Sequence, residues 1–176
     1  MSSSMSPSVI ARFAGLLYLF VVIASSYSLF ATSALIVSGD TAATAANIIA
    51  AEDQFRFAFA ANLLAAAAYV AVVALLYALF RPVSPVLAVV ASHFGLAGCA
   101  VSAVSMINLL AALSFLADAG VAAAFDAEEA QALARMCLRL GGFGNSISLV
   151  FFGFYCALLG ALVVRSRFLP RALGVF

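Results

Sequence analysis

The longest uncharged stretch of the sequence, Val86 to Ala117, is the feature that most restricts the fold. No Asp, Glu, Lys or Arg occurs between Arg81 and Asp118. As a helix, a stretch of this length would reach roughly 48 Å at ~1.5 Å per residue, more than the ~30 Å hydrocarbon core of a bilayer. The stretch therefore predicts a membrane-spanning helix with additional length for tilt or for projection into the headgroup layer.

Small residues form a stripe along this predicted helix, at spacings of four, three, four and three. They are Ala91, Gly95, Gly98, Ser102 and Ser105. In a membrane, such a stripe lets a neighbouring helix approach closely. His93 lies roughly 160° from the stripe at ~100° per residue, and a polar ring is costly in contact with lipid. We therefore expect protein on both sides of this helix, which would make it the central helix of the bundle.

Composition places the chain among integral membrane proteins, because 67% of its residues are hydrophobic and only 9% are charged. The net charge of +1 leaves no basic patch for phosphates, so nucleic acid is not an expected partner. Cys99, Cys137 and Cys156 lack metal-ligand spacing, and we expect no metal, cofactor or disulfide framework. The expected partners are the lipid bilayer and, in addition, a second copy of the chain or another membrane protein.

Four apolar stretches predict four transmembrane helices, at residues 12–37, 57–80, 86–117 and 141–164. Residues 1–8 are expected to be a disordered polar tail, and residues 9–176 a single helical membrane domain. The first apolar stretch is longer than the ~7–15 residues of a signal-peptide core, so we expect it to be retained as a span. The short proline-containing connection at residues 81–85 requires the second and third spans to be antiparallel, and Ser84 in it is expected to cap the third span.

The first of the two longer connections predicts a short helix that is capped by Asp40 and extends to about residue 49. Glu52 and Arg56 follow, four residues apart and in the favourable order for an ion pair.

The second connection has a capping-box pattern in Asp126 and Glu129. The helix that it opens carries Arg135 and Arg139 beside apolar residues, which is typical of an amphipathic interfacial helix. The glycines at 141, 142 and 144 predict a bend before the fourth span. The expected fold is an all-α integral membrane protein, a four-transmembrane-helix bundle with short amphipathic helices in the two outer segments.

The arginines predict that both termini are cytoplasmic, because five lie in the segments on the N-terminal side and three in the opposite segments. The five are Arg12, Arg81, Arg165, Arg167 and Arg171, and the three are Arg56, Arg135 and Arg139.

The chain resembles an uncharacterised bacterial family of multi-pass membrane proteins, catalogued as domain of unknown function forty-three eighty-six. The resemblance extends from Ala11 to Leu173 and includes Phe55-Arg56. It rests on residues 11–18 (ARFAGLLY), 35–40 (LIVSGD), 43–48 (ATAANI), 76–83 (LYALFRPV), 151–153 (FFG) and 166–174 (SRFLPRALG). It implies a helical protein of the bacterial inner (cytoplasmic) membrane and no particular activity. Members usually continue beyond the last motif into further spans, whereas this chain stops at Phe176, so we expect a short or truncated member.

Counting residues from the helix ends gives a candidate polar cluster in the cytoplasmic half, made of His93, Tyr155, Cys156 and Tyr18. A membrane histidine with a tyrosine or cysteine neighbour could relay protons or take part in redox chemistry. The simpler alternative is a neutral histidine that is bonded to a carbonyl or a tyrosine.

A second candidate group, in the outer half, is Asn62, Asn108, Asn145 and Ser28. These residues could line a polar cavity that is open to the outside, or form hydrogen bonds between helices that fix the packing. Ser146, Gly153 and Gly160, seven apart, predict a second packing seam on the fourth span.

Three functions are consistent with these patterns. The first is a non-enzymatic accessory or scaffold protein that acts through helix–helix or lipid contacts. The second is a small oligomeric transporter or channel with an outward-facing Asn/Ser cavity, which would need a continuous polar track. The third is a membrane redox or proton-relay protein that uses His93. No arrangement of catalytic residues is present in the sequence, so we do not expect an enzyme.

Overall fold

The computed structural model of the chain describes residues 6–122 and 124–166. Its helices are α1 (Pro7–Ser33), α2 (Thr41–Ala50), α3 (Glu52–Phe80), α4 (Pro85–Ala117), α5 (Ala119–Ala122) and α6 (Ala127–Arg165). The helices α1, α3, α4 and α6 are long and apolar enough to cross a membrane. No strand occurs in the described part, and the predicted all-α fold with four spans is confirmed.

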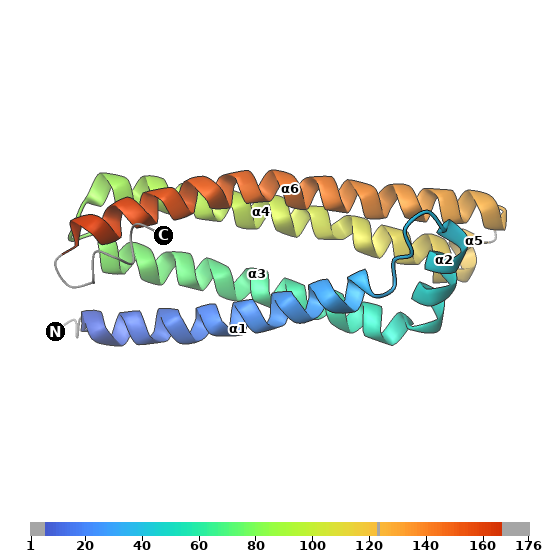
Figure 1. Cartoon of the computed structure of the whole chain (residues 1–176), viewed down its shortest axis with the longest axis horizontal. Helices are drawn as coiled ribbons and strands as arrows, with labels where there is room; N and C mark the ends of the chain where they lie inside the picture. Colours follow the sequence, from blue (N-terminus) through green and yellow to red (C-terminus); the bar gives the residue numbers. More distant parts are fainter. Residues whose placement is uncertain (1–5, 123, 167–176) are drawn as a thin grey trace.

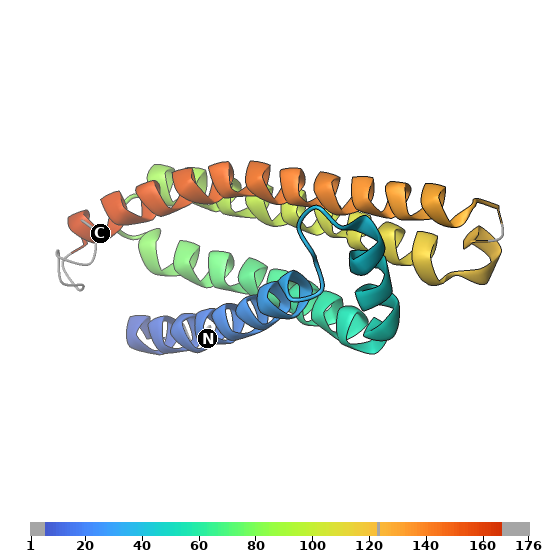
Figure 2. The ribbon, with the colours of Figure 1, turned by 45° about the vertical axis from the view of Figure 1, so that its right-hand side comes forward.

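The spanning helices form two pairs, α1 with α3 and α4 with α6 (Figure 1). Contacts between α3 and α4 join the pairs, while α1 contacts α4 and α6 slightly or not at all. The start of α1 and the end of α6 lie at one end of the bundle, which we call the terminal end. The short helix α2 lies across the opposite end, which we call the α2 end (Figure 2).

The helix starts agree with the predicted caps. Asp40 Oδ1 accepts the N–H of Ala43 at 2.8 Å, and Ser84 Oγ accepts the N–H of Leu87 at 3.4 Å. At the start of α6, Asp126 and Glu129 form the complete capping box.

Two predicted boundaries are wrong. The first span ends at Ser33 instead of residue 37, and a turn follows in which Gly39 has a φ of 85°, a backbone region that favours glycine. The interfacial helix and the fourth span are one continuous helix, α6, without a break at the glycines. Gly141 is instead buried against α4, where an added Cβ would lie 3.3 Å from Leu109. The glycine serves close helix packing rather than a bend.

The predicted small-residue stripe on α4 lies at the contacts of that helix. Ala91, Gly95, Gly98 and Ser105 are buried and Ser102 is half-buried. A Cβ added at Gly95 would lie 2.9 Å from Val73 of α3 and 3.3 Å from the Tyr155 ring of α6. The helix α4 is therefore packed between α3 and α6.

The predicted seam on α6 is wrong. Ser146 and Gly153 are exposed, Gly160 is half-buried, and a Cβ at Gly153 would meet nothing within 4 Å. The buried positions lie two residues further along, again seven apart: Gly141, Ser148, Tyr155 and Leu162.

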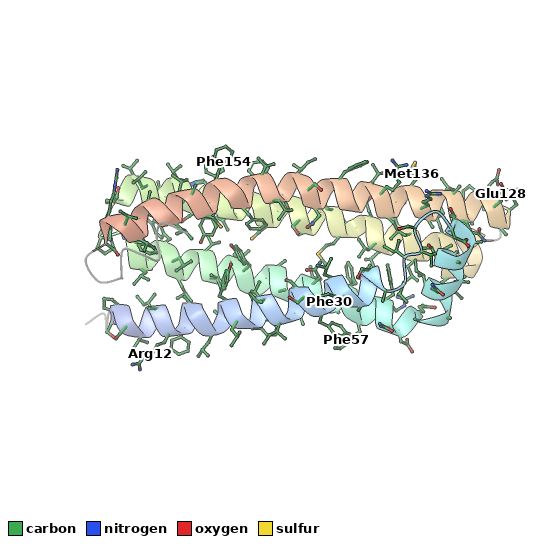
Figure 3. The ribbon with its side chains drawn as sticks, in the orientation of Figure 1. Arg12, Phe30, Phe57, Glu128, Met136 and Phe154 are labelled. Carbon is green, nitrogen blue, oxygen red and sulfur yellow. The ribbon has the colours of Figure 1, made fainter. Side chains whose placement is uncertain are left out.

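Large apolar side chains cover the outside of the bundle, as expected of a surface in contact with lipid. Phe30 and Phe154 are 72% and 56% exposed, and Figure 3 shows Phe154 pointing away from the helices.

Candidate functional site

A cavity of about 570 Å³ lies between the four spanning helices. Its floor consists of α3 and α4 and contains the buried residues Ala65, Cys99 and Met106. Its walls are α1 and α6, where Leu29 and Leu149 line it and yet remain 67% and 60% exposed. Because the floor is buried and both walls are exposed, the cavity opens sideways between α1 and α6. We call it the α1–α6 groove.

An apolar cluster packs beside the groove toward each end of the bundle. At the terminal end, Val73, Phe80 and Leu162 belong to a core cluster against which the groove residues Tyr69 and Phe152 pack. At the α2 end, Leu35, Ile48, Phe55 and Leu113 form a second cluster, against which the groove residues Leu109 and Leu138 pack. The groove therefore does not form a continuous polar track through the bundle.

Three of the four predicted outer polar residues line the groove: Ser28, Asn62 and Asn145. Within residues 6–122 and 124–166, the side-chain amides of Asn62 and Asn145 form no hydrogen bond, and Ser148 Oγ donates to the backbone carbonyl of Asn145, not to its amide. Both amides are therefore available to a polar group of a ligand.

The fourth residue of that group, Asn108, is outside the lining. Its Nδ2 donates to the carbonyl of Ser105 at 3.2 Å, on the same helix. The Ser105 hydroxyl lines the groove but donates to the carbonyl of Val101 at 2.7 Å. These bonds remain within α4 and use the Ser105 hydroxyl and one N–H of the Asn108 amide.

The predicted inner group is divided by the structure. Tyr18 and Cys156 line the groove, whereas Tyr155 is buried behind it. Tyr69 belongs to neither predicted group but contacts both Tyr18 and Tyr155. Its ring centroid lies 5.9 Å from that of Tyr18 and 6.2 Å from that of Tyr155. Tyr69 is seven residues after Asn62, which places both on one face of α3, and this spacing was the signal in the sequence.

His93 is exposed on the outer surface of α4, so the expectation of protein on that side of the helix is wrong for the single chain. Its Nδ1 is 2.7 Å from the carbonyl oxygen of Val89, one turn earlier. No hydrogen bond links it to Tyr155 or Cys156 in the described part of the chain. The proton-relay hypothesis required that contact and therefore loses its basis.

A second pocket, of about 220 Å³, adjoins the groove at the α2 end. The loop before α2, one face of α2, Leu116 of α4 and one face of α6 line it, and Ile36 and Leu138 border both cavities. Arg135 and Arg139 lie in its wall, and Arg135 Nη1 donates to Thr41 Oγ1 at 3.0 Å. We call this cavity the arginine pocket.

No curated protein and no solved structure matches the chain. A family model described as "Domain of unknown function (DUF4386)" matches residues 13–176, nearly the whole sequence. This match confirms the resemblance drawn from the sequence motifs. The chain, with its four membrane-spanning helices, therefore belongs to the DUF4386 family.

Proposed function

We propose that this protein is a non-enzymatic membrane protein that binds a lipid, with an acyl chain of the lipid lying in the α1–α6 groove. The observation that carries the proposal is a cavity that opens sideways between two lipid-facing helices and has an apolar cluster beside it toward each end of the bundle. A ligand that enters such a site comes from the bilayer and remains in contact with it.

The depth of the groove supports this proposal. The uncharged parts of α3 and α6 begin after Arg56 and Arg139, which places the edge of the hydrocarbon core near these residues. Asn62 and Asn145 each lie six residues further in, or about 9 Å. From Leu138 to Cys156 the groove follows α6 for roughly 27 Å, whereas one leaflet contributes about 15 Å of hydrocarbon. A lipid chain of one leaflet fits within this length.

The lining also suits an amphipathic ligand. In the part of the groove toward the α2 end, the amides of Asn62 and Asn145 and the hydroxyl of Ser28 can pair with polar groups of a ligand. An amide without a partner is costly in a membrane, so a ligand that satisfies it is favoured. Deeper in the bilayer, Leu149 and Phe152 offer apolar contact to a chain. The apolar clusters toward each end support binding over conduction and weigh against the transporter or channel alternative.

Filling the groove tests lipid binding. Gly142 lines the groove, and a Cβ there would meet nothing within 4 Å, so Gly142→Phe adds a ring to the groove without displacing another helix. We expect the affinity for phosphatidylcholine, measured by native mass spectrometry of the detergent-purified protein, to fall about tenfold, which corresponds to ~1.4 kcal/mol of lost contact.

The matched control is Gly153→Phe, at an exposed position of the same helix where a Cβ also meets nothing within 4 Å and which is not part of the lining. This variant should bind the lipid like the parent. Equal effects of the two variants, or a parent that retains no lipid, would show that the groove is not a lipid site.

We further propose that the protein lies in the inner membrane with the terminal end in the cytoplasm, as the arginine distribution favours. In intact cells, a membrane-impermeant thiol reagent should label Ala127→Cys and miss Ser8→Cys, with the native cysteines replaced by serine. Both positions are exposed and neither change removes an arginine or a cap. Labelling of Ser8→Cys alone would mean the opposite orientation.

A further inference from the structure

We infer that the bound lipid carries an anionic headgroup, whose phosphate is held by Arg135 and Arg139 in the arginine pocket. The inference rests on the proposed binding of a lipid chain in the groove and adds the class of lipid. Its basis is the position of the arginine pocket, which continues the groove at the end where the headgroup of such a lipid would lie.

The two arginines are at the depth of lipid phosphates. Arg139 marks the edge of the hydrocarbon core on α6, and Arg135 lies one turn further out, or about 6 Å. Residues four apart share one face of a helix, and here that face borders the pocket. A lipid chain in the groove would pass Ile36 and Leu138, which border both cavities, and would place its headgroup between the loop and α6.

The charges in the pocket favour an anion. In the described part of the chain, the one ion pair within 4.0 Å joins Arg56 to Glu52, so neither pocket arginine is neutralised by a carboxylate in this way. Asp40 also lines the pocket, but its Oδ1 accepts the N–H of Ala43 at 2.8 Å and caps α2. The lining of the pocket thus contains two guanidinium groups and one carboxylate, so its net charge is positive and favours an anion.

The geometry of the arginines is also suited to phosphate. A guanidinium group offers several N–H donors in one plane and binds phosphate oxygens in pairs. Arg135 uses Nη1 for Thr41 Oγ1, which accepts this bond and keeps its own O–H for a phosphate oxygen. Arg139 lies with its Cζ 6.0 Å from the centre of the Phe143 ring, and within residues 6–122 and 124–166 it forms no ion pair with a carboxylate. The donors needed for a phosphate group are therefore present.

Competition between two lipids tests the inference. The full chain in detergent is offered phosphatidylglycerol and phosphatidylcholine with identical acyl chains in equal amounts, and bound lipids are counted by native mass spectrometry. We expect the parent to prefer phosphatidylglycerol about tenfold. Arg135→Gln combined with Arg139→Gln should reduce this preference to near equality while phosphatidylcholine remains bound. Arg56→Gln, at the same depth but outside the pocket, should retain the preference.

The outcomes separate the two proposals. A parent that binds both lipids equally, or a double variant that keeps its preference, would overturn the headgroup inference and leave the groove as a lipid site. A parent that binds neither lipid would overturn both. A millimolar excess of inorganic phosphate should not displace phosphatidylglycerol; displacement would identify the arginine pocket as a site for the free anion and contradict the inference.

Discussion

Replacing Gly144 with leucine is expected to lower the free energy of unfolding by about 3 kcal/mol or more, at the upper end of what overpacking costs. At Gly144, α6 lies directly against Ser105 of α4. A Cβ at this position would overlap the Ser105 hydroxyl and lie 2.7 Å from Ser105 Cβ, so rotation of the hydroxyl would not relieve the contact. The backbone of α4 is next, with Ser105 Cα at 3.6 Å. The two helices would have to separate.

The effect can be measured by unfolding the protein in mixed micelles of increasing SDS content. Gly153→Leu is the matched control, because it changes the same residue types on the same helix at an exposed position with no neighbour within 4 Å. It should unfold like the parent, or slightly later because leucine has the higher helix propensity. If Gly144→Leu also unfolds like the parent, the contact between α4 and α6 at Ser105 does not hold the pair together.

The sequence was sufficient for the number and approximate place of the spans. Uncharged stretches longer than a bilayer core have few other structures available, because every buried backbone group must be bonded within the helix. The caps at Asp40, Ser84 and Asp126 were also predictable, since they depend on residues three positions apart on one segment. In each case the predictable feature depends on residues that are close together in the sequence.

The rotation of α6 about its axis was not predictable in this way. The predicted seam and the buried line share a spacing of seven but differ by two positions, which is roughly 200° at ~100° per residue. Small residues occur on both faces, at Gly153 and at Gly141, so their presence did not identify the face that meets α4. Buried Tyr155 and Leu162 lie on the correct face, and large side chains there contradict a rule that relies on small residues alone.

The same uncertainty in the rotation of the helices explains why only some of the candidate site residues were grouped correctly. Depth along the helices was correct for Asn62 and Asn145, which line one groove, but depth alone also grouped His93 with Tyr155. His93 faces outward and Tyr155 faces inward, and only the packing of α4 between its neighbours decides this. The groove itself depends on α1 packing along α3 and standing apart from α6, a long-range arrangement with no local signal.

Replacing Tyr155 with phenylalanine is expected to stabilise the protein by about 1 kcal/mol or more, whereas most single substitutions destabilise. The Tyr155 side chain is 2% exposed and lies in the apolar cluster at the terminal end, near Val73 and Leu162. In the part of the chain that the structure describes, its hydroxyl is buried without a hydrogen-bond partner. Phenylalanine keeps the ring that packs against Gly95 and removes the unsatisfied group.

The matched control is Tyr27→Phe, because Tyr27 is 41% exposed and its ring lies edge-on to Phe57 at 5.5 Å between centroids. Because Tyr27 is an exposed residue, the change in stability should stay within about 0.5 kcal/mol. Thermal unfolding in detergent, followed by the loss of helical circular dichroism, compares both variants with the parent. A lower melting temperature for Tyr155→Phe would mean that the hydroxyl is bonded in the folded protein, as it would be to a water molecule trapped between α3, α4 and α6. The buried hydroxyl would then be part of what holds these three helices together.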